Sequence, residues 1–384
     1  MADPKEAVYP ADPHTTAKHH ILEEYLKRWL PILAKQSQRV GGTNGRLLYV
    51  DGFAGAGEYI GNIPGSPLVA IQTALQQCQN FRVPVQIKLI ELRHDRAVHL
   101  QKIVAERRSG LGNNQKLIID DPIEGDCEAE IHKLITEHEQ TRRKLGPALF
   151  FLDQFGYSSF SMDLIGRILK NDVCEVFSYL NWNLLHPFMT DQTKWVGITK
   201  AFGGEEWRKV LGLNGKQKED LFRDVYVHAL RTRAGAKFSY PFAMRDNNNR
   251  VIYWLFFCSN NIRGLEEMKK AMWQVDRSGS FEFSDKHATQ HGKLFSYNEQ
   301  ALAAALESSL DGREMTVAEI QEYVLLNTPA CNFKSALQNL ERRGVLTPIK
   351  APPSRRSCSF TDDTLRVRIA KKKACIAQQP TLFG

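Results

Sequence analysis

The chain has 384 residues, of which 42% are hydrophobic and 24% charged, and its formal net charge is +8. This length suits two or three domains, and the composition is that of a globular protein. No apolar run reaches about 18 residues, so no membrane span is expected, and the first residues lack the apolar core of a signal peptide. The seven cysteines are dispersed without C-x-x-C spacing. That pattern predicts reduced thiols, a cytoplasmic protein and no metal site built on cysteine.

The excess positive charge is concentrated near the carboxyl end. Residues 350–373 contain eight lysines and arginines but only two aspartates. A basic segment favours an anionic polymer such as nucleic acid as a partner. A solvated tail is the alternative, which charge alone leaves equally open.

The first predicted element is a long helix near the amino end. Residues 1–13 contain three prolines and no hydrophobic period, which predicts an irregular arm. Thr15 or Thr16 could cap a helix running to about residue 35, because apolar side chains then recur at helical spacing. Lys18, His19 and His20 in its first turn are most simply solvated. The alternative is that they line a cofactor pocket.

A glycine-rich turn follows the first predicted strand. Residues 47–50 read as a buried parallel strand, and residues 52–57 as a turn in which backbone can approach a ligand. The spacing departs from the dinucleotide fingerprint. It resembles the first motif of S-adenosylmethionine-dependent methyltransferases acting on nucleic-acid bases, where the turn holds the methionine part of the cofactor. A packed turn without a ligand is the alternative. The expected cofactor residues here are Asp51, Phe53, Ala54, Gly55 and Gly57.

Two further acidic residues belong to the predicted cofactor site. Glu91 ends the second strand, residues 85–92, where a carboxylate would accept hydrogen bonds from a ribose diol. A surface strand end is the alternative for Glu91. Asp126 follows a weaker third strand and could meet the exocyclic amine of an adenine. Ser66 is expected to cap the helix after the glycine turn, and residues 58–65 before it form a loop that could fold over a ligand.

The predicted catalytic residues follow a wholly apolar strand, residues 148–152. Asp153 would orient a base amine, and Phe155 and Tyr157 would stack on the base. Amino-methyltransferases carry Asp or Asn, Pro, Pro and an aromatic residue at this place. The match is partial, because Gln154 and Phe155 occupy the proline positions and Gly156 the aromatic one. A strand end with buried aromatic residues is the alternative.

The remaining elements of this part complete a sheet. Residues 174–188 contain the fifth strand, residues 189–235 are mostly helical, and residues 237–246 and 251–260 predict an antiparallel hairpin around a turn-rich stretch. A helix over residues 264–276 follows. We therefore expect residues 14–290 to form an α/β domain with a mostly parallel, class I methyltransferase-like (Rossmann-like) sheet.

The pattern changes at about residue 297. Three helices are predicted over residues 298–310, 317–327 and 332–343, and then two strands joined through P-P-S-R-R. This outline predicts a winged-helix domain over residues 297–370 and a basic, irregular tail over residues 371–384. Protein docking is the alternative use of such a domain. The expected nucleic-acid contacts are Lys334, Gln338, Arg342, Arg355 and Arg356.

Several motifs together resemble the bacterial three-Cys-motif partner family. They are K-H-x-I-L-x-x-Y-L-x-x-W from Lys18, Y-V-D-G-F-A-G-A-G-E-Y from Tyr49, G-S-P-L from Gly65, L-D-Q-F-G from Leu152 and K-K-A-M-W-Q-V-D from Lys269. The family usually has D-P-F-G where this chain has D-Q-F-G. The resemblance covers about residues 14–350.

The resemblance implies a methyltransferase-like core and a second protein with three clustered cysteines, which looks like a radical S-adenosylmethionine protein. The leading hypothesis is therefore an S-adenosylmethionine-binding protein that acts on nucleic acid, with direct in-line methyl transfer. The second hypothesis is a non-catalytic adaptor that has kept the fold and recruits a partner to DNA.

Overall fold

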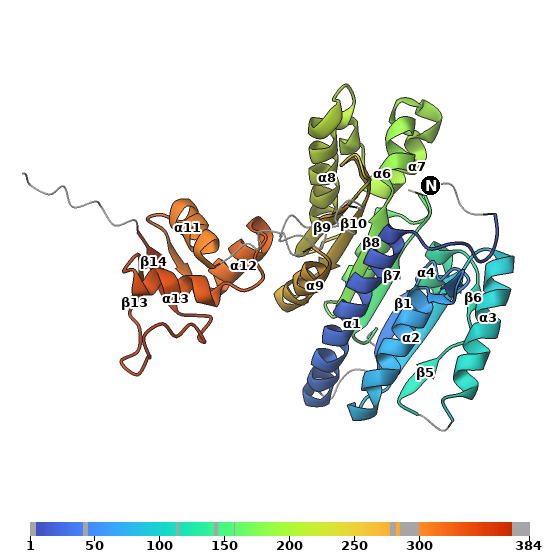
Figure 1. Cartoon of the computed structure of the whole chain (residues 1–384), viewed down its shortest axis with the longest axis horizontal. Helices are drawn as coiled ribbons and strands as arrows, with labels where there is room; N and C mark the ends of the chain where they lie inside the picture. The colour runs from blue at the N-terminus through green and yellow to red at the C-terminus, as the bar shows by residue number, and fades with distance from the viewer. Residues whose placement is uncertain are drawn as a thin grey trace, which may run out of the picture. The chain divides into compact units, whose positions relative to one another are not determined.

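The structure is a computed structural model that describes residues 5–40, 45–112, 115–141, 145–156, 158–276, 282–284 and 299–370. The chain divides into two compact units, Met1–Leu294 and Phe295–Gly384 (Figure 1). Within the described ranges no helix is long and apolar enough to cross a membrane. The predicted tail, residues 371–384, lies outside the described residues.

The first unit is built on one sheet, in the order β11-β9-β10-β8-β7-β1-β4-β5. Neighbouring strands are parallel except at β10, which is antiparallel to both β8 and β9. This arrangement confirms the predicted α/β class with a mostly parallel sheet. The strands are β1 (Leu47–Asp51), β4 (Val85–Glu91), β5 (Leu117–Ile119), β7 (Ala148–Leu152), β8 (Cys174–Leu180), β9 (Phe238–Arg245), β10 (Val251–Ser259) and β11 (Glu282–Ser284), with β6 (Ile123–Glu124) paired to the end of β4.

The central strands are buried along their whole length. Every residue of β1, β7 and β8 is buried, which explains why their sequences are apolar rather than alternating. From β1 the chain moves outward to β4 and β5, and then returns to β7 on the other side of β1. The strand order therefore reverses between β1 and β7. In open α/β sheets, ligands bind at the carboxyl ends of the strands beside such a reversal.

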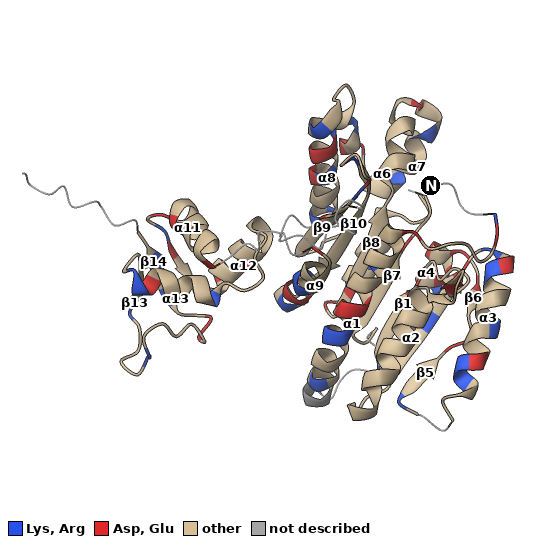
Figure 2. Cartoon of the chain, in the orientation of Figure 1, with Lys and Arg blue, Asp and Glu red and all other residues tan. Residues whose placement is uncertain are grey.

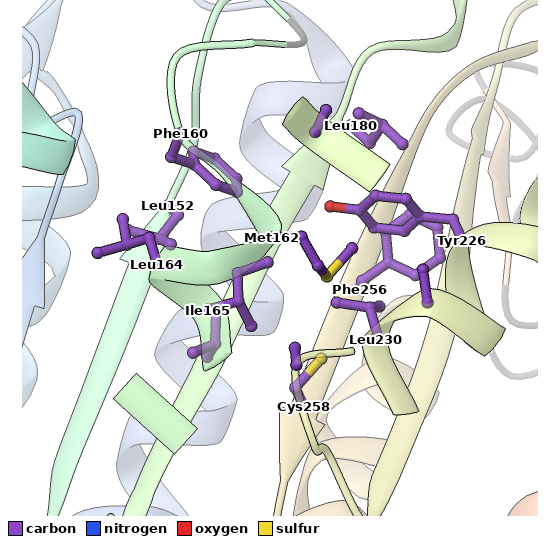
Figure 3. Packing of buried hydrophobic residues seen from close by; sticks show 14 of the residues in the cluster. Leu152, Phe160, Met162, Leu164, Ile165, Leu180, Tyr226, Leu230, Phe256 and Cys258 are labelled. Atoms are coloured by element: carbon purple, nitrogen blue, oxygen red, sulfur yellow. The ribbon is translucent and has the colours of Figure 1, made fainter. Parts of the chain in front are cut away.

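Helices cover the sheet. Figure 1 shows α1 and α2 on the viewer's side of the strands, and α1 contacts both α2 and α9. A large apolar cluster joins α4, α5 and α8 to β1, β7, β8 and β10. Figure 3 shows part of it, where Met162 and Ile165 of α5 face Leu230 of α8 and Phe256 of β10. The helices are α1 (Pro13–Val40), α2 (Ser66–Gln77), α3 (His94–Ser109), α4 (Cys127–Gln140), α5 (Met162–Leu169), α6 (Trp182–Leu185), α7 (Trp195–Phe202), α8 (Gly215–Thr232) and α9 (Ile262–Val275).

Three predictions about the first helix were wrong: its cap at Thr15 or Thr16, and the solvated positions of Lys18 and His19. The first helix begins at Pro13, and its cap is Asp12, whose carboxylate accepts a hydrogen bond from the Thr15 amide at 2.6 Å. Lys18 and His19 are each only 6% exposed, although His20 is exposed as expected. A helix start packed against the sheet replaces the predicted solvated one.

The segment after the glycine turn also differs from its prediction. Ser66 is the first residue of α2 rather than its cap, and Gly65 precedes it without a side-chain capping bond. The predicted loop contains a short antiparallel hairpin of β2 (Glu58–Tyr59) and β3 (Ile63–Pro64). Each strand of this hairpin has only two residues, which is too short to show the alternation of apolar and polar residues that predicts a strand.

The second unit contains α11 (Glu299–Ser309), α12 (Val317–Asn327) and α13 (Lys334–Arg342), with β12 (Glu314–Thr316), β13 (Leu346–Ile349) and β14 (Arg366–Ile369). Thr316 caps α12 as predicted, in a reciprocal capping box with Glu319. Strands β13 and β14 pair antiparallel, and β12, which was not predicted, adds to the other side of β14. A separate apolar core joins all six elements.

Candidate functional site

A buried aspartate, Asp51, accepts a hydrogen bond from the backbone of the glycine turn. Asp51 is fully buried, and it accepts hydrogen bonds from the Phe53 amide at 3.2 Å and from the Tyr49 hydroxyl at 3.1 Å. Burial is the main cause that raises the pKa of Asp51 to about 7, and the nearby Asp153 adds to it. Asp51 therefore shapes the turn and is not exposed to a ligand.

Gly55 and Gly57 both have backbone conformations that favour glycine, but the space around them differs. Gly55 has φ +62° and Gly57 has φ +89°, conformations that side chains other than glycine rarely adopt. A Cβ on Gly57 would lie 2.8 Å from Leu100 Cδ1, whereas a Cβ on Gly55 would meet no atom within 4 Å. Gly55 is therefore the point of this turn where backbone borders open space. Ala54 is buried, and Phe53 packs against Phe160 with ring centroids 6.2 Å apart.

Glu91 links the second strand to this turn. One carboxylate oxygen accepts a hydrogen bond from the Gly55 amide, and the other accepts one from the Arg93 amide, both at 2.8 Å. The side chain lies at the end of β4, as predicted, with 7% exposure. It therefore has a structural role in closing the turn besides any role toward a ligand.

Asp126 lies at the start of α4. Its side chain accepts a hydrogen bond from the Ala129 amide at 2.9 Å, so it is the amino-terminal cap of that helix. The residue is exposed. The capping bond accounts for its position, and contact with an adenine stays a prediction.

The end of β7 is occupied by an ion pair. The Lys18 ammonium donates to the Asp153 carboxylate, and the two side chains are only 7% and 16% exposed. Gln154 is buried, donating to the Tyr179 carbonyl oxygen at 3.2 Å and accepting from the Ser159 amide at 2.9 Å. Phe155 is 36% exposed. Tyr157, the third predicted catalytic residue, lies outside the described residues.

A pocket lies at this edge of the sheet. The empty space in it is about 510 Å³, with the open solvent at its mouth included. Aromatic rings make up much of its wall, and the rings of Tyr179 and Tyr253 lie with centroids 4.4 Å apart and planes inclined at 51°. The lining residues are Tyr9, Asp12, Thr15, Lys18, Tyr59, Asp153, Gln154, Phe155, Tyr179, Asn181, Ile252 and Tyr253.

The structure thus brings Asp153 and Phe155 into one pocket, while Gly55 and Glu91 are joined to each other at the adjacent strand ends. Sequence reasoning missed Tyr9, Asp12 and Tyr253 as lining residues. Tyr253 follows the start of an antiparallel strand, and no local pattern distinguishes it from core aromatic residues. Lys18 lines this pocket, and whether a cofactor binds there stays a prediction.

A buried histidine supports the same region. His19 packs 5.8 Å from the ring of Tyr59, and burial, with the neighbouring Lys18, lowers its pKa to about 3. It is therefore neutral at physiological pH. Among the described residues, no group of three or more histidine, cysteine, aspartate or glutamate side chains could hold a metal ion.

In the second unit, two of the five predicted nucleic-acid residues have structural partners. Arg355 makes a bidentate ion pair with Glu341, at 2.7 and 2.8 Å. Gln338 donates to the Cys358 carbonyl oxygen at 3.1 Å. Both bonds hold residues 350–360 against α13, and contact of Gln338 and Arg355 with nucleic acid stays a prediction. Arg342 and Arg356 are exposed and Lys334 is half-buried.

Charge on the first unit is mixed. Figure 2 shows acidic and basic residues beside one another on α3, α8 and α9. Ion pairs within one helix, such as Lys270 with Glu266 and Glu267 on α9, account for part of this pattern. These helices therefore offer no single-sign face to a polyanion.

Comparisons with known proteins found distant likenesses only. No family model matches the chain, and no curated protein matches it. The plantazolicin methyltransferase BamL, solved with a triazolic desmethylPZN analog and SAH, is 11% identical, with 64% of this chain and 86% of that chain covered and a TM-score of 0.26. A DUF574 family protein from Streptomyces avermitilis is 10% identical, covering 61% and 81%, with a TM-score of 0.25.

A protein from Galdieria sulphuraria, proposed to be a sarcosine dimethylglycine methyltransferase, is also 10% identical, with 67% of this chain and 94% of that chain covered and a TM-score of 0.26. Similarities this low leave the function to be argued from the residues and topology of the chain itself.

Proposed function

We propose that this protein binds S-adenosylmethionine at the carboxyl edge of its sheet and transfers a methyl group to a nucleic-acid base. The observation that carries the proposal is a glycine turn and a strand-end acid beside the strand reversal, next to a pocket rich in aromatic rings. That position is the expected ligand site of an open α/β sheet.

The strand order supports the class of enzyme. Numbered from β1 along the chain, the seven main strands run 3-2-1-4-5-7-6, as β5, β4, β1, β7, β8, β10 and β9, with the seventh antiparallel. This is the order of the class I methyltransferase fold. A fold by itself does not establish an activity, so the residues at the strand ends carry the rest.

The cofactor would lie against Gly55 and Glu91. S-adenosylmethionine would supply an electrophilic methyl group on a positively charged sulfur. A carboxylate has about four acceptor positions, and Glu91 uses two of them for the Gly55 and Arg93 amides. Two remain for the hydroxyls of a ribose. The open space beside Gly55 would take the methionine part, as the motif resemblance implies.

The acceptor would enter the aromatic pocket. Tyr179, Tyr253 and Phe155 offer ring faces and edges to a flat base. The Asn181 side-chain oxygen already accepts from the Leu184 amide at 3.0 Å, so the side-chain amide of Asn181 would serve as a donor at the edge of the base. The acceptor nitrogen would form the new bond to carbon as the carbon–sulfur bond breaks, and its surplus proton would pass to the Asp153 carboxylate. Orientation by the pocket would supply most of the acceleration.

The family resemblance extends the proposal beyond this chain. We infer that the protein belongs with the three-Cys-motif partner proteins and works beside a cysteine-rich protein. The second unit, with three helices and a three-stranded antiparallel sheet, suits a winged helix that binds DNA. Lys334, Arg342 and Arg356 are its candidate phosphate contacts, because Arg355 is already paired.

Calorimetric titration of the full chain with S-adenosylmethionine tests the proposal. We expect saturable binding below millimolar concentration in the wild type. Glu91→Ala removes charge-assisted hydrogen bonds to a diol, so the affinity should fall about tenfold to a hundredfold. Glu124→Ala is the matched control, since Glu124 also ends a strand but is exposed and pairs with His94. Absence of binding by the wild type at millimolar cofactor would refute the cofactor proposal.

The adaptor is the second candidate, and one observation favours it. Asp153 already receives the Lys18 ammonium, and Gln154 satisfies its amide within the protein. An adaptor would bind duplex DNA but transfer no label from methyl-labelled cofactor. DNA binding by either candidate should depend on salt. Changing Lys334, Arg342 and Arg356 together to alanine should flatten the log–log slope by roughly 0.9 for each phosphate that the protein no longer neutralises.

A further inference from the structure

The irregular arm, residues 5–12, is attached across the carboxyl edge of the sheet. The Arg93 guanidinium donates to the Lys5 carbonyl oxygen at 2.7 Å, and the Ile60 amide donates to the Tyr9 carbonyl oxygen at 3.1 Å. Arg93 follows β4, and Ile60 lies in the hairpin after the glycine turn. The arm, dark blue in Figure 1, therefore connects the two segments that carry Glu91 and Gly55.

The ring of Tyr9 contacts side chains from several elements. It meets Tyr59 edge-on at 5.2 Å and Phe155 at 6.3 Å. The guanidinium of Arg96, a residue only 2% exposed, lies 5.4 Å from the Tyr9 ring and 5.1 Å from the Phe155 ring. Cation–π contacts of a desolvated arginine are among the stronger interactions of aromatic side chains. Tyr9 thus joins the hairpin, the β7 loop and α3.

The arm also forms part of the pocket wall. Tyr9 and Asp12 line the pocket, and so do Thr15 and Lys18 from the first turns of α1. Without the arm, the aromatic wall of Tyr59 and Phe155 would lack the ring that lies between them. The identity of the ligand rests on the proposed function, but the composition of this wall does not.

We propose that the amino-terminal arm is a strap over the site, and that Tyr9 is the residue that both latches it and completes the pocket. Residues 5–12 have no regular secondary structure and are exposed or half-buried, and segments with few buried contacts open at low free-energy cost. The strap lifts to admit a ligand and then closes over it. Closure places the Tyr9 ring over the bound ligand and slows its release.

The test compares Tyr9→Ala with Tyr9→Phe in the full chain, and Glu6→Ala serves as a control on an exposed arm residue. Association and dissociation rates of S-adenosylhomocysteine are measured by surface plasmon resonance, and exchange of the Ile60 amide by hydrogen–deuterium exchange. Because Tyr9→Ala removes the ring, it should raise the dissociation rate about tenfold. Exchange at Ile60 should also become faster. Tyr9→Phe, which keeps the ring, should stay within about threefold of the wild type.

The outcomes separate the strap from the proposed function. A wild type that binds S-adenosylhomocysteine, with a dissociation rate unchanged in Tyr9→Ala, would overturn the strap and leave the function standing. A wild type that binds no S-adenosylhomocysteine would remove the proposed function and the strap with it. Equal exchange of the Ile60 amide in the wild type and Tyr9→Ala would show that Tyr9 does not latch the arm, whatever the ligand.

Discussion

Replacing Asp51 by asparagine should change how the stability of the first unit depends on pH. Burial raises the pKa of Asp51 from 3.8 to about 7. Because the folded-state pKa is the higher one, the folded state binds this proton more tightly than the unfolded chain. The resulting stability is fully present below pH about 4 and is lost as the pH rises to about 7. Asparagine is neutral at every pH, so the stability of Asp51→Asn does not change with the ionisation of this side chain.

The magnitude follows from the width of the window. Stability of the wild type should fall by about 1.4 kcal/mol per pH unit while Asp51 is protonated in the folded state and ionised in the unfolded state. Between pH 5.5 and 8 the stability of Asp51→Asn relative to the wild type should therefore rise by about 2 kcal/mol. The asparagine still offers an oxygen to the Phe53 amide, so the turn keeps its main hydrogen bond.

Urea unfolding followed by tryptophan fluorescence measures the stability difference between Asp51→Asn and the wild type for the first unit alone. All six tryptophans lie in the first unit, so the signal does not report the second. His19 titrates in the opposite direction, since its pKa is lowered to about 3, but it is present in both proteins and cancels in the comparison. A stability difference that stays constant from pH 5.5 to 8 would refute the reasoning about Asp51.

Two further predictions concern packing in each unit. Gly52→Ala would place a Cβ 2.5 Å from the buried Cys127 sulfur and 2.9 Å from Leu152 Cδ2, so urea unfolding should show a loss of about 1–3 kcal/mol. An unchanged midpoint would mean that α4 can shift away from the turn. Arg355→Ala removes both hydrogen bonds to Glu341, and hydrogen exchange in residues 350–360 should become faster while the tryptophan transition stays unchanged. Unaltered exchange there would contradict the structural role given to Arg355.

The sheet of the first unit was predictable because its central strands are apolar at every position. Residues 148–152 form a strand with the predicted bounds, and Glu91 and Asp153 lie at strand ends as expected. A buried strand carries its signal in a few consecutive residues, so no alignment or long-range information is needed. The third helix of the second unit was similarly clear, since Phe333, Ala336, Leu337 and Leu340 are all buried.

The partners of polar side chains could not be predicted in this way. Asp12 and Asp126 are caps, and Arg355 pairs with Glu341, because a local backbone or side-chain group is available to each. The contacts of Tyr9 with Tyr59 and Phe155 span about 50 and about 150 residues of sequence. No periodic pattern records such a contact, and only the folded chain brings the arm to the site.

The Lys18–Asp153 ion pair is the point on which the enzyme and the adaptor differ. Removing one partner from a partly buried ion pair is destabilising, because the other charge is left without a partner. An acceptor that binds Asp153 must therefore compensate Lys18 for the interaction that it weakens. A base bound in the aromatic wall can do so, because the Lys18 ammonium also lies 5.7 Å from the Tyr179 ring and keeps that contact. In an enzyme the pair would therefore hold Asp153 in place until an acceptor arrives. In an adaptor it would simply fasten α1 to the end of β7.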